Sequence, residues 1–200
     1  LADGLRQIPE GMRRADNPLD LDEAESGLSL EASVGTLVHR CLEIIAKNGL
    51  ESWSTARVAA LQPTYRRWLH AQGHGEAEAA NGAGEVVAAL GNTLDSAIGR
   101  WVLADHPEAA AEQAWSSTDG NGAADHIIDR VFVVEGCRWI VDYKTVRLPE
   151  DELPARALSY RPQLERYARL FADQPLPLRL AVFFPLQGRL VEIPCEGSAL

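Results

Sequence analysis

Helical spacing of apolar residues is the first clear pattern along the chain. From about Leu30, apolar side chains recur every three or four positions, and Gly49 follows Asn48 as a typical stop signal for a helix. Residues 1–29 show no such period and are broken by prolines and glycines, so we interpret them as a linker or a loosely docked arm. The ordered fold is therefore expected to begin at about Leu30.

Two more segments, residues 54–71 and 84–104, have the same helical spacing. Pro63 interrupts the first of them, and a region rich in alanine and glycine, residues 73–84, joins the two. Together these segments predict an α-helical insertion over about residues 50–106.

The pattern changes to strands after His106 and Pro107. Apolar runs bounded by turn signals predict five strands, over residues 110–117, 125–134, 137–144, 178–184 and 189–193. Glu135 and Gly136 form a tight turn between the second and third strands, and an amphipathic helix is predicted over residues 156–172. This order predicts an α/β (α+β) fold, in which a central mixed sheet of about five strands is flanked by helices.

Length and composition fit a single domain. At 200 residues, 46% of them apolar, the chain can bury one sizeable core, which we place in residues 30–193, followed by a tail at residues 194–200. The sequence has no initiator Met, no signal-type segment and no apolar run near bilayer length, so we expect a piece of a longer polypeptide without membrane contacts. Cys41, Cys137 and Cys195 lie far apart, which disfavours disulfides and metal knuckles and fits a reducing cytoplasm.

The net charge of -10 has the wrong sign for an isolated nucleic-acid-binding protein, because affinity for DNA depends on neutralising phosphates with Lys and Arg. The charge is unevenly distributed, however. Residues 130–200 hold ten Lys and Arg against nine Asp and Glu, whereas residues 1–129 hold nine against twenty. If DNA is the substrate, we expect this piece alone to bind it weakly and another part of the parent chain to deliver it.

Charged residues interrupt the apolar strands at the mouth of the predicted hairpin. Asp129 lies in the run HIIDRVFVV, and Asp142 and Lys144 lie in WIVDYKT. Because side chains alternate along a strand, Asp142 and Lys144 point to the same face. Hard cations such as Mg2+ bind oxygen ligands of this kind and keep positions for water and substrate phosphate. The combination suits the hydrolysis of a phosphodiester.

A structural role is the alternative for each of these residues. Asp129 could form an ion pair with Arg130 or Lys144, which would satisfy a carboxylate on a buried strand. Asp142 and Lys144 could form a surface pair worth about 0.2–1 kcal/mol. The residue types alone leave these alternatives open.

Four further residues are candidates for the same site. His39 lies on the first predicted helix, and imidazole is a common metal ligand, although a lone helical histidine is more often structural. Glu112 opens the strand before the hairpin and either reaches the cleft or marks a strand end. Gln163 and Tyr167 lie four residues apart on one helix face, where they either bind phosphate or a metal-bound water, or form a partly exposed surface.

Five segments, GTLVHRCLE, AAAEQAW, HIIDRVF, WIVDYKT and PQLERYARL, occur in this order. With them, about residues 31–193 resemble the RecB-like nuclease domain of the PD-(D/E)XK superfamily, which is found at the C-terminus of RecB and AddA helicase–nucleases and of related bacterial UvrD/Rep-type proteins. The spacing of Asp129 and Asp142, followed at once by Lys144, carries the resemblance. It implies a restriction-endonuclease-like core in a bacterial cytoplasmic protein. The metal ligands that it implies for Mg2+ or Mn2+ are His39, Asp129, Asp142 and the backbone carbonyl of Tyr143.

The resemblance also implies roles for the remaining candidates. Lys144 would orient or deprotonate the attacking water and offset charge on the phosphate. Gln163 and Tyr167 match a QLxxY element that supports the active site and contacts nucleic acid, and Glu112 matches an acidic position on the first strand. One departure is His126, which stands where family members commonly have glycine. Related iron–sulfur nucleases carry four cysteines that this chain lacks, which favours the RecB and AddA side.

The implied function is a metal-dependent DNA nuclease of exonuclease type within an ATP-dependent helicase–nuclease for double-strand break repair and recombination. Its partners would be DNA, the helicase domains of the parent chain and partner subunits. No GxxxxGK[ST] loop occurs here, so an ATPase motor would have to lie elsewhere. The alternatives are a stand-alone endonuclease or junction resolvase of the same superfamily, and a nuclease-like module that has become purely structural.

Overall fold

The computed structural model describes residues 6–7, 28–119 and 122–194, with side chains described outside residues 6–7 and 112–126. The helices are α1 (Leu30–Asn48), α2 (Thr55–Ala60), α3 (Gln62–Ala71), α4 (Glu76–Asp95), α5 (Ala97–Leu103), α6 (Leu153–Leu158) and α7 (Arg161–Arg169), with short 3-10 helices at Leu50–Ser52 and Glu150–Glu152. The strands are β1 (Arg6–Gln7), β2 (Ala110–Asp119), β3 (Gly122–Val134), β4 (Cys137–Tyr143), β5 (Leu178–Phe184) and β6 (Arg189–Ile193).

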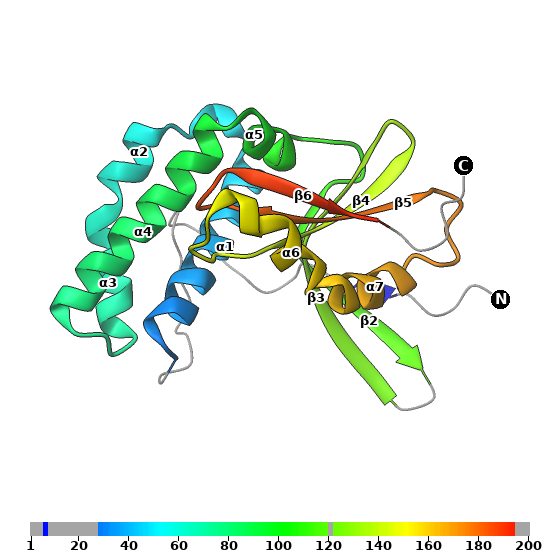
Figure 1. Cartoon of the computed structure of the whole chain (residues 1–200), viewed down its shortest axis with the longest axis horizontal. Helices are drawn as coiled ribbons and strands as arrows, with labels where there is room; N and C mark the ends of the chain where they lie inside the picture. The colour runs from blue at the N-terminus through cyan, green and yellow to red at the C-terminus, as the bar shows by residue number, and fades with distance from the viewer. Residues whose placement is uncertain (1–5, 8–27, 120–121, 195–200) are drawn as a thin grey trace.

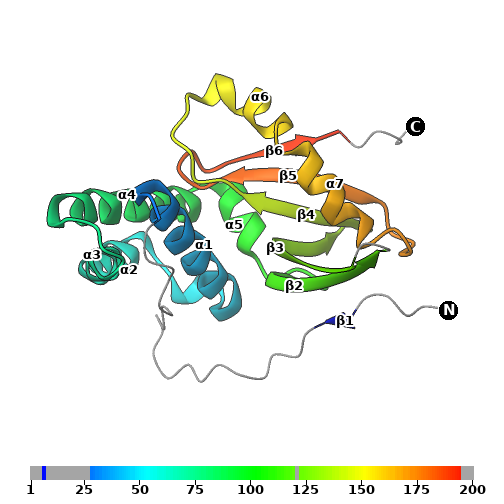
Figure 2. The same ribbon diagram turned by 90° about the horizontal axis from the view of Figure 1, so that it is seen from below.

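The strands form one mixed sheet in sequence order, from β1 to β6. Only the β4–β5 pair is parallel among the described strands, and the other neighbours are antiparallel. Figure 2 shows β2 to β6 in this order, with α6 and α7 over one side of the sheet. The prediction of a mixed sheet of about five strands flanked by helices is confirmed, with the two-residue β1 as an added edge pairing.

The hairpin between β3 and β4 turns at the predicted place. Glu135 and Gly136 have φ angles of 51° and 74°, so both central residues adopt the left-handed conformation that two-residue hairpin turns require. The register then pairs Val134 with Cys137 and continues to Arg130 opposite Val141. This register fixes which residues of the two strands reach the end of the hairpin together.

Two separate clusters of buried apolar side chains lie on the two faces of the sheet. The first core cluster joins α1 to α5 to one face, and its largest members include Leu37, Leu42, Tyr65, Leu90, Phe132 and Phe183. The second core cluster joins α6 and α7 to the opposite face, and its members include Ile140, Leu164, Phe171, Val182 and Phe184. Figure 1 shows α1 to α4 as a helical lobe beside the sheet, while α6 and α7 lie across it.

The boundaries of the helical insertion differ from the prediction. The break at Leu61 before Pro63 is as expected, but α4 begins at Glu76, so most of the segment predicted to join two helices is itself helical. Close packing explains this. A Cβ atom added to Gly82 would lie 2.9 Å from Cδ1 of Leu69 on α3, so the small residues of α4 allow its neighbours to approach.

Two predicted helices are each divided in two. The segment predicted over residues 84–104 breaks at Ser96, whose hydroxyl accepts a hydrogen bond from the backbone N–H of Gly99 and caps α5. The helix predicted over residues 156–172 is replaced by α6 and α7, because Pro162 lacks an N–H and is accommodated only in a first helical turn. This second break places Arg156 on α6 and Gln163 on α7.

Two remaining expectations concern cysteines and membranes. Cys41 and Cys137 are free thiols, while Cys195 lies outside the described residues. Among the residues that the structure describes, none of the helices has both the length and the apolar character needed to cross a bilayer.

Candidate active site

The backbone pairing of β3 with β4 ends just before the two candidate aspartates. The last recorded pair of β3 and β4 is Arg130 with Val141, one residue short of Asp129 and Asp142. Beyond this pair, the backbone N–H of Tyr143 donates a hydrogen bond to Oδ2 of Asp129 at 2.6 Å. A carboxylate thus replaces a ladder partner, which fixes the Asp129 side chain between the two strands.

His39 reaches Asp129 from the first helix. Its Nδ1 lies 3.0 Å from Oδ1 of Asp129, and its ring packs edge-on against Tyr143 with the ring centroids 5.7 Å apart. The neighbouring α1 residues Val38 and Leu42 are fully buried in the first core cluster, so the helix holds the imidazole in place. The predicted grouping of His39 with Asp129 is therefore present in the structure.

The structural alternatives for Asp129 do not occur. Arg130 turns away and donates hydrogen bonds to the backbone carbonyls of Val102 and Ala104, at 3.1 and 2.7 Å. Lys144 pairs with Asp142 instead. Asp129 is 8% exposed, and its recorded partners are the imidazole of His39 and a backbone amide.

Asp142 follows Val141 at the end of β4, in register with Asp129 and on the face where α7 packs. It is 2% exposed, and its Oδ2 lies 2.8 Å from the Nζ of Lys144, two residues further along the chain. The amide of Gln163 donates from Nε2 to Oδ1 of Asp142 at 3.0 Å. The expectation that Asp142 and Lys144 share a face is met, but the pair is largely buried and is not a surface ion pair.

Gln163 and Tyr167 lie one helical turn apart on α7, and their side chains contact each other beside Asp142. The same Nε2 of Gln163 that contacts Asp142 also donates to the phenol oxygen of Tyr167, at 2.7 Å. An amide NH2 has two hydrogens and can satisfy both acceptors. Tyr167 thereby orients Gln163, and Gln163 orients Asp142.

Burial and neighbouring charges shift the pKa values of this group. Burial, followed by the negative charge of Asp129, raises the pKa of Asp142 from its ordinary value of 3.8 to about 6, although Lys144 opposes the shift. Burial lowers the pKa of Lys144, but the charge and hydrogen bond of Asp142, together with smaller contributions from Asp129 and Tyr160, outweigh burial, so the net pKa shift is upward. Burial also raises the pKa of Tyr167. Lys144 is thus a cation and Tyr167 a neutral phenol at neutral pH.

Two further predictions rest on backbone position alone. Glu112 lies in β2 between Ala111, paired with Arg130, and Gln113, paired with Ile128, which places its backbone across from Asp129. The side chains of Glu112 and His126 lie outside the described residues. The backbone carbonyl of Tyr143 belongs to the peptide bond between Tyr143 and Lys144 and stays a predicted ligand.

The donor atoms suit a hard divalent cation. Carboxylate oxygens with one imidazole are ligands that Mg2+ and Mn2+ accept. A cation would also offset the repulsion between Asp129 and Asp142, which adds to burial in raising the pKa of Asp142. Within the described part of the chain, however, no group of three or more His, Cys, Asp or Glu side chains forms a metal cage. Instead, hydrogen-bond donors hold each carboxylate. Cys41 offers no thiolate, because burial raises its pKa to about 12.

Tyr160 is a member of the site that the sequence analysis missed. The Nζ of Lys144 lies 4.9 Å from the centroid of its ring, a cation–π contact that limits where the ammonium can move. A sequence signal was available, because Tyr160 stands three residues before Gln163 and seven before Tyr167, the spacing of one helix face.

Comparison with known protein families shows the superfamily of the chain. The family model of the PD-(D/E)XK nuclease superfamily matches residues 12–193, and the chain therefore belongs to this superfamily. No curated protein matches the chain. Among solved structures, protein VC1899 from Vibrio cholerae is similar at 16% identity, with 82% of this chain and 55% of that chain covered and a TM-score of 0.25. The chain thus spans just over half the length of that protein.

Proposed function

We propose that this chain hydrolyses phosphodiester bonds of DNA with Mg2+ or Mn2+. The observation that carries the proposal is the meeting of two held carboxylates at the end of one hairpin, Asp129 with His39 on one side and Asp142 with Lys144 on the other. Membership of a nuclease superfamily supports the same reaction class. Three side chains would hold the cation together with the carbonyl of Tyr143, namely His39, Asp129 and Asp142.

Each side chain has a task that follows from its contacts. A bound divalent cation would supply Lewis-acid stabilisation of the phosphate and a more acidic water. Lys144 is held as an ammonium by Asp142, so we assign it the stabilisation of negative charge on the phosphate and the orientation of the attacking water. Its raised pKa argues against deprotonation of that water by Lys144. Gln163 and Tyr167 keep Asp142 in position.

The first test is the metal-dependent cleavage of linear single-stranded DNA by the wild-type chain and by Asp142→Asn. The variant removes the charge of a central carboxylate, so we expect it to lose at least about a thousand-fold in kcat. Asp173→Asn makes the same chemical change at an exposed position and should cleave normally. Full metal-dependent activity of Asp142→Asn would show that the assignment is wrong.

We further propose that the domain acts as an exonuclease within a larger ATP-dependent helicase–nuclease in DNA repair and recombination. The net charge of -10 supports this, since the chain has little electrostatic attraction for DNA and would depend on delivery by other domains or subunits. A stand-alone endonuclease should cut a closed circular duplex and a resolvase a four-way junction, whereas an exonuclease should digest only DNA with a free end. Rapid cutting of the circle would favour the stand-alone alternative.

A catalytically inactive module is the remaining alternative, and metal binding distinguishes it. Isothermal titration of Mn2+ should show a site whose affinity falls in both His39→Ala and Asp129→Asn. Protein that binds no Mn2+ and cleaves nothing would be a structural element.

A further inference from the structure

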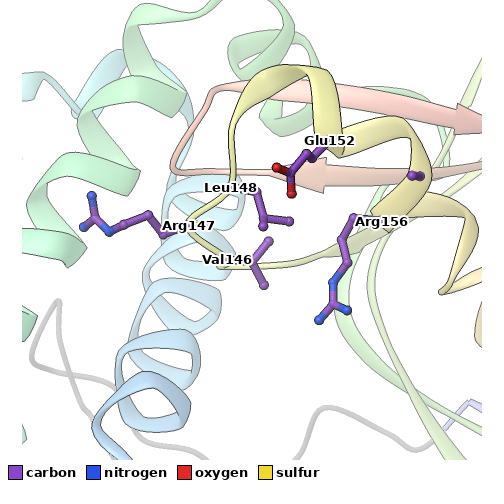
Figure 3. A pocket seen from close by; sticks show the side chains of 6 residues that line it. Val146, Arg147, Leu148, Glu152 and Arg156 are labelled. Carbon is purple, nitrogen blue, oxygen red and sulfur yellow. The ribbon is translucent and has the colours of Figure 1, made fainter.

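A cavity of about 470 Å3 opens beside the candidate active site, between the segment that follows β4 and the helix α6. This volume lies within the range of about 300–1,000 Å3 that is usual for small-molecule sites. Figure 3 shows its lining, which consists of Val146, Arg147, Leu148, Glu152, Ala155 and Arg156. Val146 and Leu148 are half-buried and pack on the second core cluster, while Arg147 and Arg156 are exposed. An apolar base with basic edges suits a nucleotide.

One aromatic ring joins this cavity to the catalytic ammonium. The guanidinium carbon of Arg156 lies 5.2 Å from the centroid of Tyr160, and the Nζ of Lys144 lies 4.9 Å from the same centroid. On the other side, the backbone N–H of Val146 donates to the carbonyl of Lys144 at 3.1 Å. The cavity therefore begins within two residues of Lys144 and is one ring away from its side chain.

The cavity wall is held in shape by polar contacts. The amide of Gln187, in the turn between β5 and β6, donates to the carbonyls of Val146 and Leu148, at 3.1 and 3.0 Å. Between these two residues, Arg147 forms an ion pair with Glu85 of α4 at 3.3 Å. Such a wall loses little freedom when a ligand binds, which favours affinity.

We propose that this cavity binds the nucleotide next to the scissile phosphate on the substrate strand, with Arg156 on its phosphate and Val146 and Leu148 against its sugar and base. The proposal rests on the proposed function. Arg156 is assigned the phosphate because Arg147 already has a carboxylate partner. In Figure 3 the Glu152 carboxylate points toward Leu148 and away from the Arg156 guanidinium, so it does not compete with phosphate for Arg156. Basic side chains on the phosphates are a usual contact for single strands.

The test compares two substrates, a single-stranded oligonucleotide and bis(p-nitrophenyl) phosphate, which has a phosphodiester but no neighbouring nucleotide. In Arg156→Gln, the kcat/KM for the oligonucleotide divided by that for the small diester should fall about ten-fold, chiefly through KM. The slope of log Kd against log salt for the oligonucleotide, measured by anisotropy in EDTA, should fall by about 0.7. Arg66→Gln removes the charge of another exposed arginine, on α3, which forms an ion pair with Glu76, and should change neither quantity.

The outcomes separate this inference from the proposed function. An active wild-type chain whose substrate ratio and salt slope are unchanged in Arg156→Gln would overturn the nucleotide site and leave the nuclease assignment intact. A chain that binds the oligonucleotide through Arg156 but cleaves neither substrate would retain the site and overturn the nuclease. Equal losses in Arg156→Gln and Arg66→Gln would show a general charge effect and would also overturn the site.

Discussion

The two faces of the sheet contribute to the site in different ways. On the face of α1, a large core cluster holds a single imidazole, that of His39, against Asp129. On the face of α7, a smaller cluster leaves room for a chain of polar groups, in which Tyr167 orients Gln163 and Gln163 orients Asp142. Strand β4 divides these tasks by alternation, because Asp142 and Tyr143 point to opposite faces.

This difference suggests that the α1 face supplies a ligand and rigidity, while the α7 face supplies orientation and substrate contacts. Both the cation–π contact of Lys144 and the cavity beside Arg156 lie on the side of α6 and α7. Variants on the two faces should therefore differ in the size and in the kind of their effects.

Among side chains of the helices that cover the two faces, the largest effect is expected for His39→Ala, which removes both a proposed metal ligand and a side-chain partner of Asp129. We expect kcat to fall about a thousand-fold and Mn2+ affinity to fall in calorimetry. His74→Ala is a matched control, since His74 also contacts α1, through the hydroxyl of Ser33 at 2.8 Å, but lies away from the site. Comparable losses of kcat in the two variants would mean that His39 acts only through the packing of α1.

The second prediction concerns the stability of the protein in EDTA. The pKa of Asp142 is raised to about 6 by burial and by Asp129, against 3.8 when unfolded. Between these two pH values the folded state binds more protons than the unfolded state, so stability falls as pH rises through this window and stays low above it. Asp142→Asn removes this penalty and should stabilise the protein at pH 7 by about 3 kcal/mol, a figure that already includes the attraction between Asp142 and Lys144.

Urea unfolding at pH 4 and pH 7 measures this effect. The gain from Asp142→Asn should be present at pH 7 and nearly absent at pH 4, where the wild-type carboxyl is already protonated. Asp173→Asn, at an exposed position, should show no such difference. A variant that is less stable than wild type at pH 7 would show that the ion pair with Lys144 outweighs the burial of Asp142.

Much of the site could be predicted because its signals are local. The alternation that puts Asp142 and Lys144 on one face, the tight turn at Glu135 and Gly136, and the four-residue spacing of Gln163 and Tyr167 are all short-range features. The structure brings these residues together as expected, apart from the side chain of Glu112, which lies outside the described residues.

The missed features depend on tertiary contacts. The spacing of Tyr160 from Gln163 was a local signal, but its cation–π contacts involve Lys144, just after β4, and Arg156 of α6, and no periodicity connects Lys144 with these residues. Likewise, an alanine- and glycine-rich stretch predicts a loop by composition, yet here it forms part of α4 because Gly82 lets neighbouring helices approach. Pro162 was a local signal for the break before α7, but the prediction followed the helical periodicity of residues 156–172 and did not include the break.

A third prediction tests the orienting role of the α7 face. Gln163→Ala removes a donor to Asp142 and leaves the proposed metal ligands in place, so kcat should fall about ten-fold while Mn2+ affinity changes little. Tyr167→Phe removes only the acceptor that orients Gln163 and should cost less. Single-turnover cleavage with both variants measures this order. A loss in Gln163→Ala as large as that in His39→Ala would remove the distinction between the two faces.

The smallest effects are expected in the helical lobe, where two glycines of the same helix provide a matched pair. In Gly82→Ala, the new Cβ would lie 2.9–3.0 Å from methyl groups of Leu69, Leu30 and Val34. This overpacking should outweigh the better helix propensity of alanine, for a net loss of about 1 kcal/mol. In Gly84→Ala, nothing lies within 4 Å of the new Cβ, so propensity alone should stabilise the protein by about 0.5–1 kcal/mol.

Thermal or urea unfolding of Gly82→Ala and Gly84→Ala should therefore give shifts of opposite sign, while kcat stays at the wild-type value in both. The reason for unchanged kcat is that α4 contributes no side chain to the contacts among His39, Asp129, Asp142 and Gln163. A marked loss of activity in a folded Gly82→Ala would mean that the packing of α4 against α1 also sets the position of His39. The rigidity of the α1 face would then be part of the catalytic machinery and not only its support.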